Sequence, residues 1–178
     1  MARPQRAFDD GIFHLFVHAS DTRFLFVTDP DSVTFLVTLT TVFGRHELSP
    51  IAYTLMGNHY HLILHAQDER VSVAMQQLHT FYSRGHNRTH GRSAHLFRAH
   101  FGSRELTSDH QLLSACRYIA LNPVEAGLVL DPLAWRWSST RAHAGLESPA
   151  IPLDETALRA AFGDAPDWRQ RYLRLVAE

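Results

Sequence analysis

The chain has 178 residues, of which 45% are hydrophobic and 11% aromatic, enough for one ordinary domain with a buried core, and this excludes a disordered protein. A formal net charge of −1 argues against binding of nucleic acid through overall charge, although residues 70–104 hold six arginines and no acidic residue. Cys116 is the single cysteine, which excludes an internal disulfide framework and a multi-thiolate zinc site.

Membrane and export signals are missing from the sequence pattern. No apolar stretch reaches the length of about 18–20 residues that a membrane span needs. Residues 1–10 carry charged side chains and no apolar signal segment. We therefore expect a soluble, cytoplasmic protein without a membrane partner.

The first half of the chain is predicted to form a strand, a helix and a hairpin. Residues 11–19 combine aromatic and β-branched side chains, which is typical of a strand buried mainly on one face. Thr28 and Pro30 favour the start of a helix that should run to about residue 46. Two short apolar runs, 51–56 and 59–65, flank the turn-forming pair Gly57-Asn58 and predict a β-hairpin.

The second half is predicted to be mainly helical. An apolar stripe at helical spacing covers residues 71–87, and a basic loop and a short strand follow it up to about residue 107. Ser108 favours the start of a helix, which we expect to end at Asn122 because the residue before a proline is disfavoured in the α region. After a surface segment and a linker, two short helices are expected at residues 154–162 and 168–176.

The order strand, helix, strand, strand, helix, strand predicts an α+β protein with a ferredoxin-like, or split βαβ, fold. In this fold an antiparallel sheet carries helices on one face, with the short C-terminal helices as an addition. The other face of the sheet is then free to carry a site.

His59 and His61 form the sharpest local pattern. Residues two apart on a strand point to the same face, so the two imidazoles can reach one cation. The alternative is that both are ordinary strand histidines with hydrogen-bonded neighbours. His65 shares their face, but it lies about 13 Å beyond His61 by strand rise, too far to join them.

Tyr118 and Asn122 supply further polar groups on one side of the last long predicted helix, since they are separated by four residues. Tyr118 points about 145° away from the centre of the apolar stripe, so it is not a core residue. It is either functional or a solvated or interface tyrosine. Asn122 precedes Pro123, and the pair also fits an ordinary helix stop.

Four segments in order resemble the motifs of the REP-associated tyrosine transposases, a branch of the single-tyrosine HUH transposase superfamily. M-G-N-H-Y-H at 56–61 resembles M-P-N-H-x-H, and N-R-T-H-G-R-S-A-H-L-F at 87–97 resembles N-R-x-H-x-R-S-G-x-L-F. R-Y-I-A-L-N-P-V-E-A-G-L-V at 117–129 resembles R-Y-I-x-x-N-P-V-R-A-G-L-V, and W-S-S stands at 137–139. The resemblance covers about residues 11–145.

The resemblance implies an HUH endonuclease fold in residues 1–145, with residues 146–178 as a C-terminal helical extension. It implies that His59, His61 and Asn122 bind a divalent cation, Mg²⁺ or Mn²⁺, and that Tyr118 is the nucleophile. The activity would be that of a transposase, a metal-dependent endonuclease and strand transferase. It would act on single-stranded or hairpin DNA of repeat elements through a 5′-phosphotyrosine link. Such a protein would be associated with the nucleoid, as a monomer or a homodimer.

The basic segment then becomes a candidate DNA-binding surface, because arginines hold phosphates and aromatic rings stack on bases. A solvated charged loop is the alternative. The histidines at 86, 90, 95 and 100 fit no zinc pattern, so we expect hydrogen bonds to phosphate or backbone from them. The candidate DNA-binding residues are Arg84, Arg88, Arg92, Arg98, Arg104, Tyr82 and Phe97.

Departures from the family pattern leave a second function open. Glu125 stands where the family has an arginine, and residues 99–102 lack two cations of the family's basic segment. A domesticated DNA-binding protein of the same fold, without cleavage activity, is therefore an alternative. A metal-dependent hydrolase of another substrate is a third hypothesis, and only the histidine content motivates it.

Overall fold

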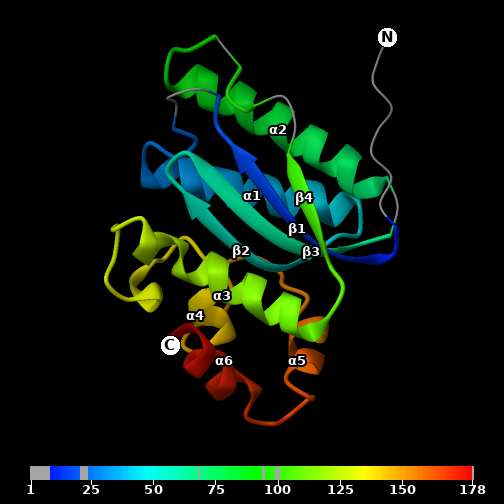
Figure 1. Ribbon diagram of the computed structural model, residues 1–178. Coiled ribbons are helices and arrows are strands. Elements are labelled where there is room, and N and C mark those ends of the chain that lie inside the picture. The colour runs from blue at the N-terminus through cyan, green and yellow to red at the C-terminus, as the bar shows by residue number, and fades with distance from the viewer. Residues whose placement is uncertain (1–8, 21–23, 68, 94, 99–100, 178) are drawn as a thin grey trace.

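The computed structural model describes residues 9–20, 24–67, 69–93, 95–98 and 101–177. Within these residues one antiparallel sheet has the strand order β2-β3-β1-β4, the order of a split βαβ fold (Figure 1). The predicted α+β, ferredoxin-like class is confirmed, and the predicted elements are present within a few residues of their expected bounds. The strands are β1 (Gly11–His18), β2 (Pro50–Met56), β3 (His59–Ala66) and β4 (Gly102–Leu106).

Two long helices cover one face of the sheet. Helix α1 (Asp29–Arg45) begins with a capping box between Thr28 and Asp31, and α2 (Arg70–Thr89) follows the hairpin. Alternate residues of the strands point toward these helices, and they bury the larger of two apolar clusters with them. Its strand members include Leu15, Val17, Tyr53, Leu55, Tyr60, Leu62 and Leu64.

A third long helix, α3 (Asp109–Glu125), lies on the opposite face of the sheet (Figure 1). Helices therefore cover both faces, where the sequence analysis expected them on one. The reason is that α3 has an apolar side of its own to bury, with Cys116 and Ile119 on it, and Ala52 and Ile63 offer an apolar patch on that face. Beside this patch, the same face carries histidines of β1 and β3 and the ring of Phe16.

Helix α3 continues past the proline at which it was expected to stop. It ends at Glu125 rather than at Asn122, with Pro123 inside its last turn. A proline has no N–H for the carbonyl one turn earlier, which here belongs to Ile119. The hydroxyl of Thr54 donates to that carbonyl instead, at 2.7 Å, so the proline is tolerated.

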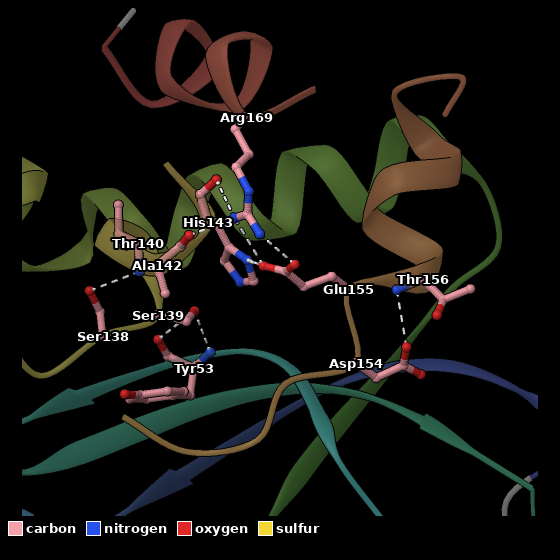
Figure 2. A network of polar contacts seen from close by, with 10 residues as sticks. All are labelled: Tyr53, Ser138, Ser139, Thr140, Ala142, His143, Asp154, Glu155, Thr156 and Arg169. Atoms are coloured by element: carbon pink, nitrogen blue, oxygen red, sulfur yellow. Dashed lines mark hydrogen bonds and ion pairs between the residues drawn. The ribbon is translucent and has the colours of Figure 1, made fainter. Parts of the chain in front are cut away.

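The C-terminal segment packs against α3. Leu158, Trp168 and Tyr172 bury one apolar cluster with α3 and the sheet. Figure 2 shows a polar network beside them, in which Arg169 bonds Glu155 at 2.8 Å and Glu155 contacts His143 at 3.2 Å. The predicted domain boundary at residue 145 stays a prediction. The elements here are η1 (Pro132–Ala134), α4 (Thr140–His143), α5 (Thr156–Ala161) and α6 (Trp168–Ala177).

Across the described residues, the helices are too short or too polar to cross a membrane.

Candidate functional site

Strand pairing gathers histidines on the face of the sheet that carries α3. In the antiparallel ladder of β1 and β3, His18 lies opposite His59, and Phe16 lies opposite His61. Paired residues and their alternate neighbours share a face. The ring centroids of His59 and His61 are 5.1 Å apart, and His18 stacks on His59 at 5.1 Å.

Helix α3 places Tyr118 and Asn122 over these histidines. The side-chain oxygen Oδ1 of Asn122 lies 3.0 Å from Nε2 of His59. The ring of Tyr118 is 5.6 Å from the ring of His61, and 44% of the tyrosine is exposed. The structure thus brings together His59, His61, Tyr118 and Asn122, the candidate metal-binding and catalytic residues of the sequence analysis.

The contacts of His59 suit a bound cation. Its Nδ1 lies 2.8 Å from the side-chain oxygen of Asn58, and its Nε2 faces the oxygen of Asn122. A neutral imidazole has one proton for these two acceptors, so at one contact a lone pair of the ring faces an oxygen, an arrangement that a cation would stabilise. Burial lowers the pKa of His59 and disfavours a second proton, although the bond to Asn122 acts the other way. The donor set therefore fits a metal ion between Nε2 and Oδ1.

His61 offers a second free lone pair. Its Nδ1 contacts Nε2 of His14 at 2.9 Å, while its own Nε2 is buried with no hydrogen-bond partner among the described residues. Burial, with a smaller effect of nearby histidines, lowers the pKa of His61 to about 3. Burial and then the charge of Arg104 lower the pKa of His14 to about 4. Both rings are therefore neutral at neutral pH, and His61 meets the requirement that a histidine that binds a metal is neutral.

His14 and Phe16 lie in this site, and neither was predicted from the sequence. His14 fixes the ring of His61 from the neighbouring strand. Phe16 is 36% exposed and lies over Gly102, where an added Cβ would meet the ring at 2.0 Å. The alternation of His14, Phe16 and His18 was a visible signal, but its meaning depends on the pairing of β1 with β3.

The predicted basic residues fall into two groups. Arg104 is exposed on β4 and paired with His14, so it shares the face of the site. The backbone N–H of Arg98 donates to the carbonyl of His18 at 3.0 Å, at the end of β1. Arg84 and Arg88 are exposed on α2, which covers the other face of the sheet, and Arg92 follows that helix.

The two predicted stacking residues lie in the core. Tyr82 is 1% exposed, and its hydroxyl donates to the carbonyl of Leu25. Phe97 is 8% exposed and stacks on His79, with ring centroids 4.0 Å apart. Neither ring has a face free for a base. Phe81, which is 44% exposed and one helical turn before Arg84, offers such a face.

Two other histidines of the sequence analysis lie away from the site or outside the description. His65 is exposed and pairs with Asp10 at 2.6 Å. His100 lies outside the described residues.

Comparison with known proteins identifies the fold. Neither a family model nor a curated protein matches the sequence. A solved structure does match, that of a REP-associated tyrosine transposase bound to a REP hairpin, with a TM-score of 0.67. The match covers 88% of this chain and 94% of that chain at 17% sequence identity. This chain has the fold of a REP-associated tyrosine transposase. The structural match therefore confirms the fold that the motif resemblance implies.

Proposed function

We propose that the protein is a transposase, a metal-dependent single-stranded DNA endonuclease and strand transferase with Tyr118 as its nucleophile. The observation that carries this proposal is the convergence of Tyr118 on α3 with His59 and His61 on β3 and with Asn122. The fold shared with a REP-associated tyrosine transposase supports it.

Mg²⁺ or Mn²⁺ would be held by Nε2 of His59, Nε2 of His61 and Oδ1 of Asn122. The unpartnered Nε2 of His61 and the two acceptors around His59 support this ligand set. Two imidazoles suit Mn²⁺ at least as well as Mg²⁺, which prefers oxygen ligands. A bound ion would act as a Lewis acid on the scissile phosphate and favour the phenolate form of the attacking tyrosine.

Tyr118 performs the covalent step in this proposal. Its phenol oxygen attacks the phosphorus, and a new O–P bond forms while the bond to the 3′ oxygen breaks. The phenol loses a proton and the departing oxygen gains one, which leaves a 5′-phosphotyrosine and a free 3′-hydroxyl. The energy of the broken bond is kept in the phosphotyrosine, so a 3′-hydroxyl can reverse the step without ATP.

Single-stranded or hairpin DNA from repeat elements is the proposed partner. Arg104 is paired with His14, and the backbone of Arg98 bonds that of His18, so we assign both arginines to phosphates beside the cut. Arg84, Arg88 and Arg92 would hold a more distant part of the DNA, with Phe81 as a stacking surface. Because one chain supplies the whole site, a monomer suffices for cleavage.

A denaturing-gel assay for covalent protein–DNA adducts tests the proposal. Hairpin oligonucleotides from repeats flanking the gene are incubated with Mn²⁺, Mg²⁺ or EDTA. We expect an adduct with wild type and a divalent ion, and none with Tyr118→Phe or EDTA. Tyr53→Phe, which removes a buried phenol elsewhere, should keep the adduct. An adduct that persists in Tyr118→Phe would overturn the assignment.

A DNA-binding protein without cleavage activity is the second candidate. Glu125, exposed at the end of α3, favours it, because a carboxylate there repels phosphate. Retention of hairpin DNA on a native gel, with no adduct under any metal, would favour this candidate over the nuclease.

A further inference from the structure

A second cluster of metal-binding side chains lies where α2 ends against α1. His86 and His90 are one helical turn apart at the end of α2, and Asp31 lies in the first turn of α1. The local sequence contains no zinc pattern here because the third residue comes from α1, a helix far away in the chain. This cluster goes beyond the proposed nuclease function and shares no residue with that site.

The three side chains converge on one point. Each offers one ligand atom, and these atoms lie within 4.8 Å of one another. Nε2 of His90 is 2.9 Å from Oδ1 of Asp31, and the rings of His86 and His90 are 4.4 Å apart.

Asp31 is held in place by its other oxygen. Oδ2 accepts hydrogen bonds from the backbone N–H groups of Val27 and Thr28 at 3.0 and 2.8 Å, and from the Thr28 hydroxyl. These bonds leave Oδ1 facing the histidines. The carboxylate is therefore preorganised as a ligand, with no further ordering required on binding.

The surroundings of His86 are further evidence that a ligand binds here. It is 2% exposed, and neither of its ring nitrogens has a hydrogen-bond partner within the part of the chain that the structure describes. A buried polar group without a partner is unfavourable, and such a group marks a missing ligand or water. The other ligand atoms lie next to it, and the side chain of His90 is 17% exposed, so an ion can enter.

We propose that Asp31, His86 and His90 form a second metal site that takes Zn²⁺, with a water molecule as the fourth ligand. Two imidazoles and a carboxylate are a common zinc ligand set. Zinc bonds of about 2.0–2.1 Å in a tetrahedron place ligand atoms about 3.3 Å apart, so a small rotation of His86 closes the site. The ion would tie α1 to the end of α2, directly before the basic residues Arg92 and Arg98.

Zinc titration of the full chain tests this proposal separately from the nuclease site. The background is a His59→Ala, His61→Ala variant, which lacks the predicted nuclease ligands. Zn²⁺ alone is titrated by calorimetry, and the unfolding temperature is recorded with and without one equivalent of the ion. We expect one bound zinc per chain and a rise in the unfolding temperature.

His86→Leu in the same background should weaken zinc binding on the order of 100-fold and abolish the zinc-induced rise. Without zinc its unfolding temperature should equal or exceed that of the background, because the substitution removes an unpaired buried polar group. His110→Gln, an exposed histidine on α3, is the matched control and should bind zinc normally.

Two results would overturn the proposal: no zinc binding in the background variant, or equal binding after His86→Leu. Because zinc binding is measured and not DNA cleavage, the test gives a clear result even if the protein has no nuclease activity. If adducts fail to form while zinc binds as expected, only the nuclease assignment falls.

Discussion

The hydroxyl of Thr54 donates a 2.7 Å hydrogen bond to the carbonyl oxygen of Ile119, which joins β2 to α3 in the interior of the protein. That carbonyl has no helical partner because Pro123 lacks an N–H. Ile119 directly follows Tyr118 and precedes Asn122 by less than one turn. The bond therefore sets the position of both candidate residues over the sheet.

Replacing Thr54 should weaken the fold and the reaction together. Thr54→Val leaves a buried carbonyl unpaired, so we expect the free energy of unfolding to fall by about 1–3 kcal/mol. Adduct formation should also slow, because α3 loses its fixed position. Urea denaturation and the adduct assay measure the two effects. Thr54→Ser keeps the hydroxyl and should show smaller losses, whereas a Thr54→Val protein equal to wild type in both assays would contradict the prediction.

His14 should act on the metal through His61. With the Nδ1 proton of His61 donated to His14, Nε2 of His61 keeps its lone pair for the ion. His14→Phe removes the acceptor, and we expect the Mn²⁺ concentration for half-maximal adduct formation to rise about 10–100-fold. Saturating Mn²⁺ should restore the adduct.

His14→Gln, which retains an acceptor, is the control and should lie closer to wild type. A purely structural role for His14 would lower the adduct at every Mn²⁺ concentration, and that result would refute the positioning role.

Phe16 should stack on a DNA base beside the site. Its ring is partly exposed and opposite His61, and stacking on an aromatic ring contributes about 1–3 kcal/mol per base. Phe16→Ala should therefore weaken the binding of a fluorescent single-stranded oligonucleotide, measured by anisotropy. Gly102→Ala should do the same, since its Cβ would lie 2.0 Å from the ring and force it to move. Val37→Ala, an exposed apolar side chain on α1, which covers the other face of the sheet, is the control; weakening of the same size there would argue against a specific stack.

Acid should destabilise the protein through His79. Burial lowers the pKa of His79 from 6.5 to about 4, and its Nε2 accepts a 2.7 Å hydrogen bond from the hydroxyl of Tyr60. The unfolded chain takes up a proton near pH 6.5 and the folded chain only near pH 4, so stability is lost as the pH falls through that window.

Between pH 7 and pH 5 this histidine alone should reduce the free energy of unfolding by about 2 kcal/mol. His79→Gln keeps an acceptor for Tyr60 but cannot titrate, so it should lose less stability over the same range. Urea denaturation at both pH values gives the comparison. Parallel losses in the two proteins would assign the acid sensitivity to other groups.

Local patterns in the sequence were sufficient for the order of the elements, and they singled out His59, His61, Tyr118 and Asn122; the roles of these four residues came from the family resemblance and stay predictions. His59 and His61 depend on strand alternation, and Tyr118 and Asn122 on helical spacing, so neither pair requires knowledge of the tertiary structure. His14 requires the register between β1 and β3, which no local pattern contains. The Asp31 contact with His86 and His90 likewise depends on how α1 packs against α2.

Two of the errors have different physical causes. Tyr82 was assigned to DNA because it lies among arginines, but helix spacing places it on the buried side of α2 while Phe81 is exposed. The end of α3 was placed at Asn122 because the residue before a proline is disfavoured in the α region, but the helix continues to Glu125, and Thr54 on β2 replaces the hydrogen bond that Pro123 removes. Helical spacing alone places Tyr82 in the core, whereas the end of α3 depends on a tertiary contact.

Helix α3 is held from two sides, by Thr54 on the sheet and by Arg117, whose Nε donates to the carbonyl of Leu175 on α6 at 3.1 Å. Arg117 and Ile119 flank Tyr118, so hydrogen bonds on both sides fix the position of the backbone at the tyrosine. In the proposed reaction a cut strand therefore stays where it was attached, and the second DNA end has to travel to meet it. The reach of that second end then decides which ends can be joined.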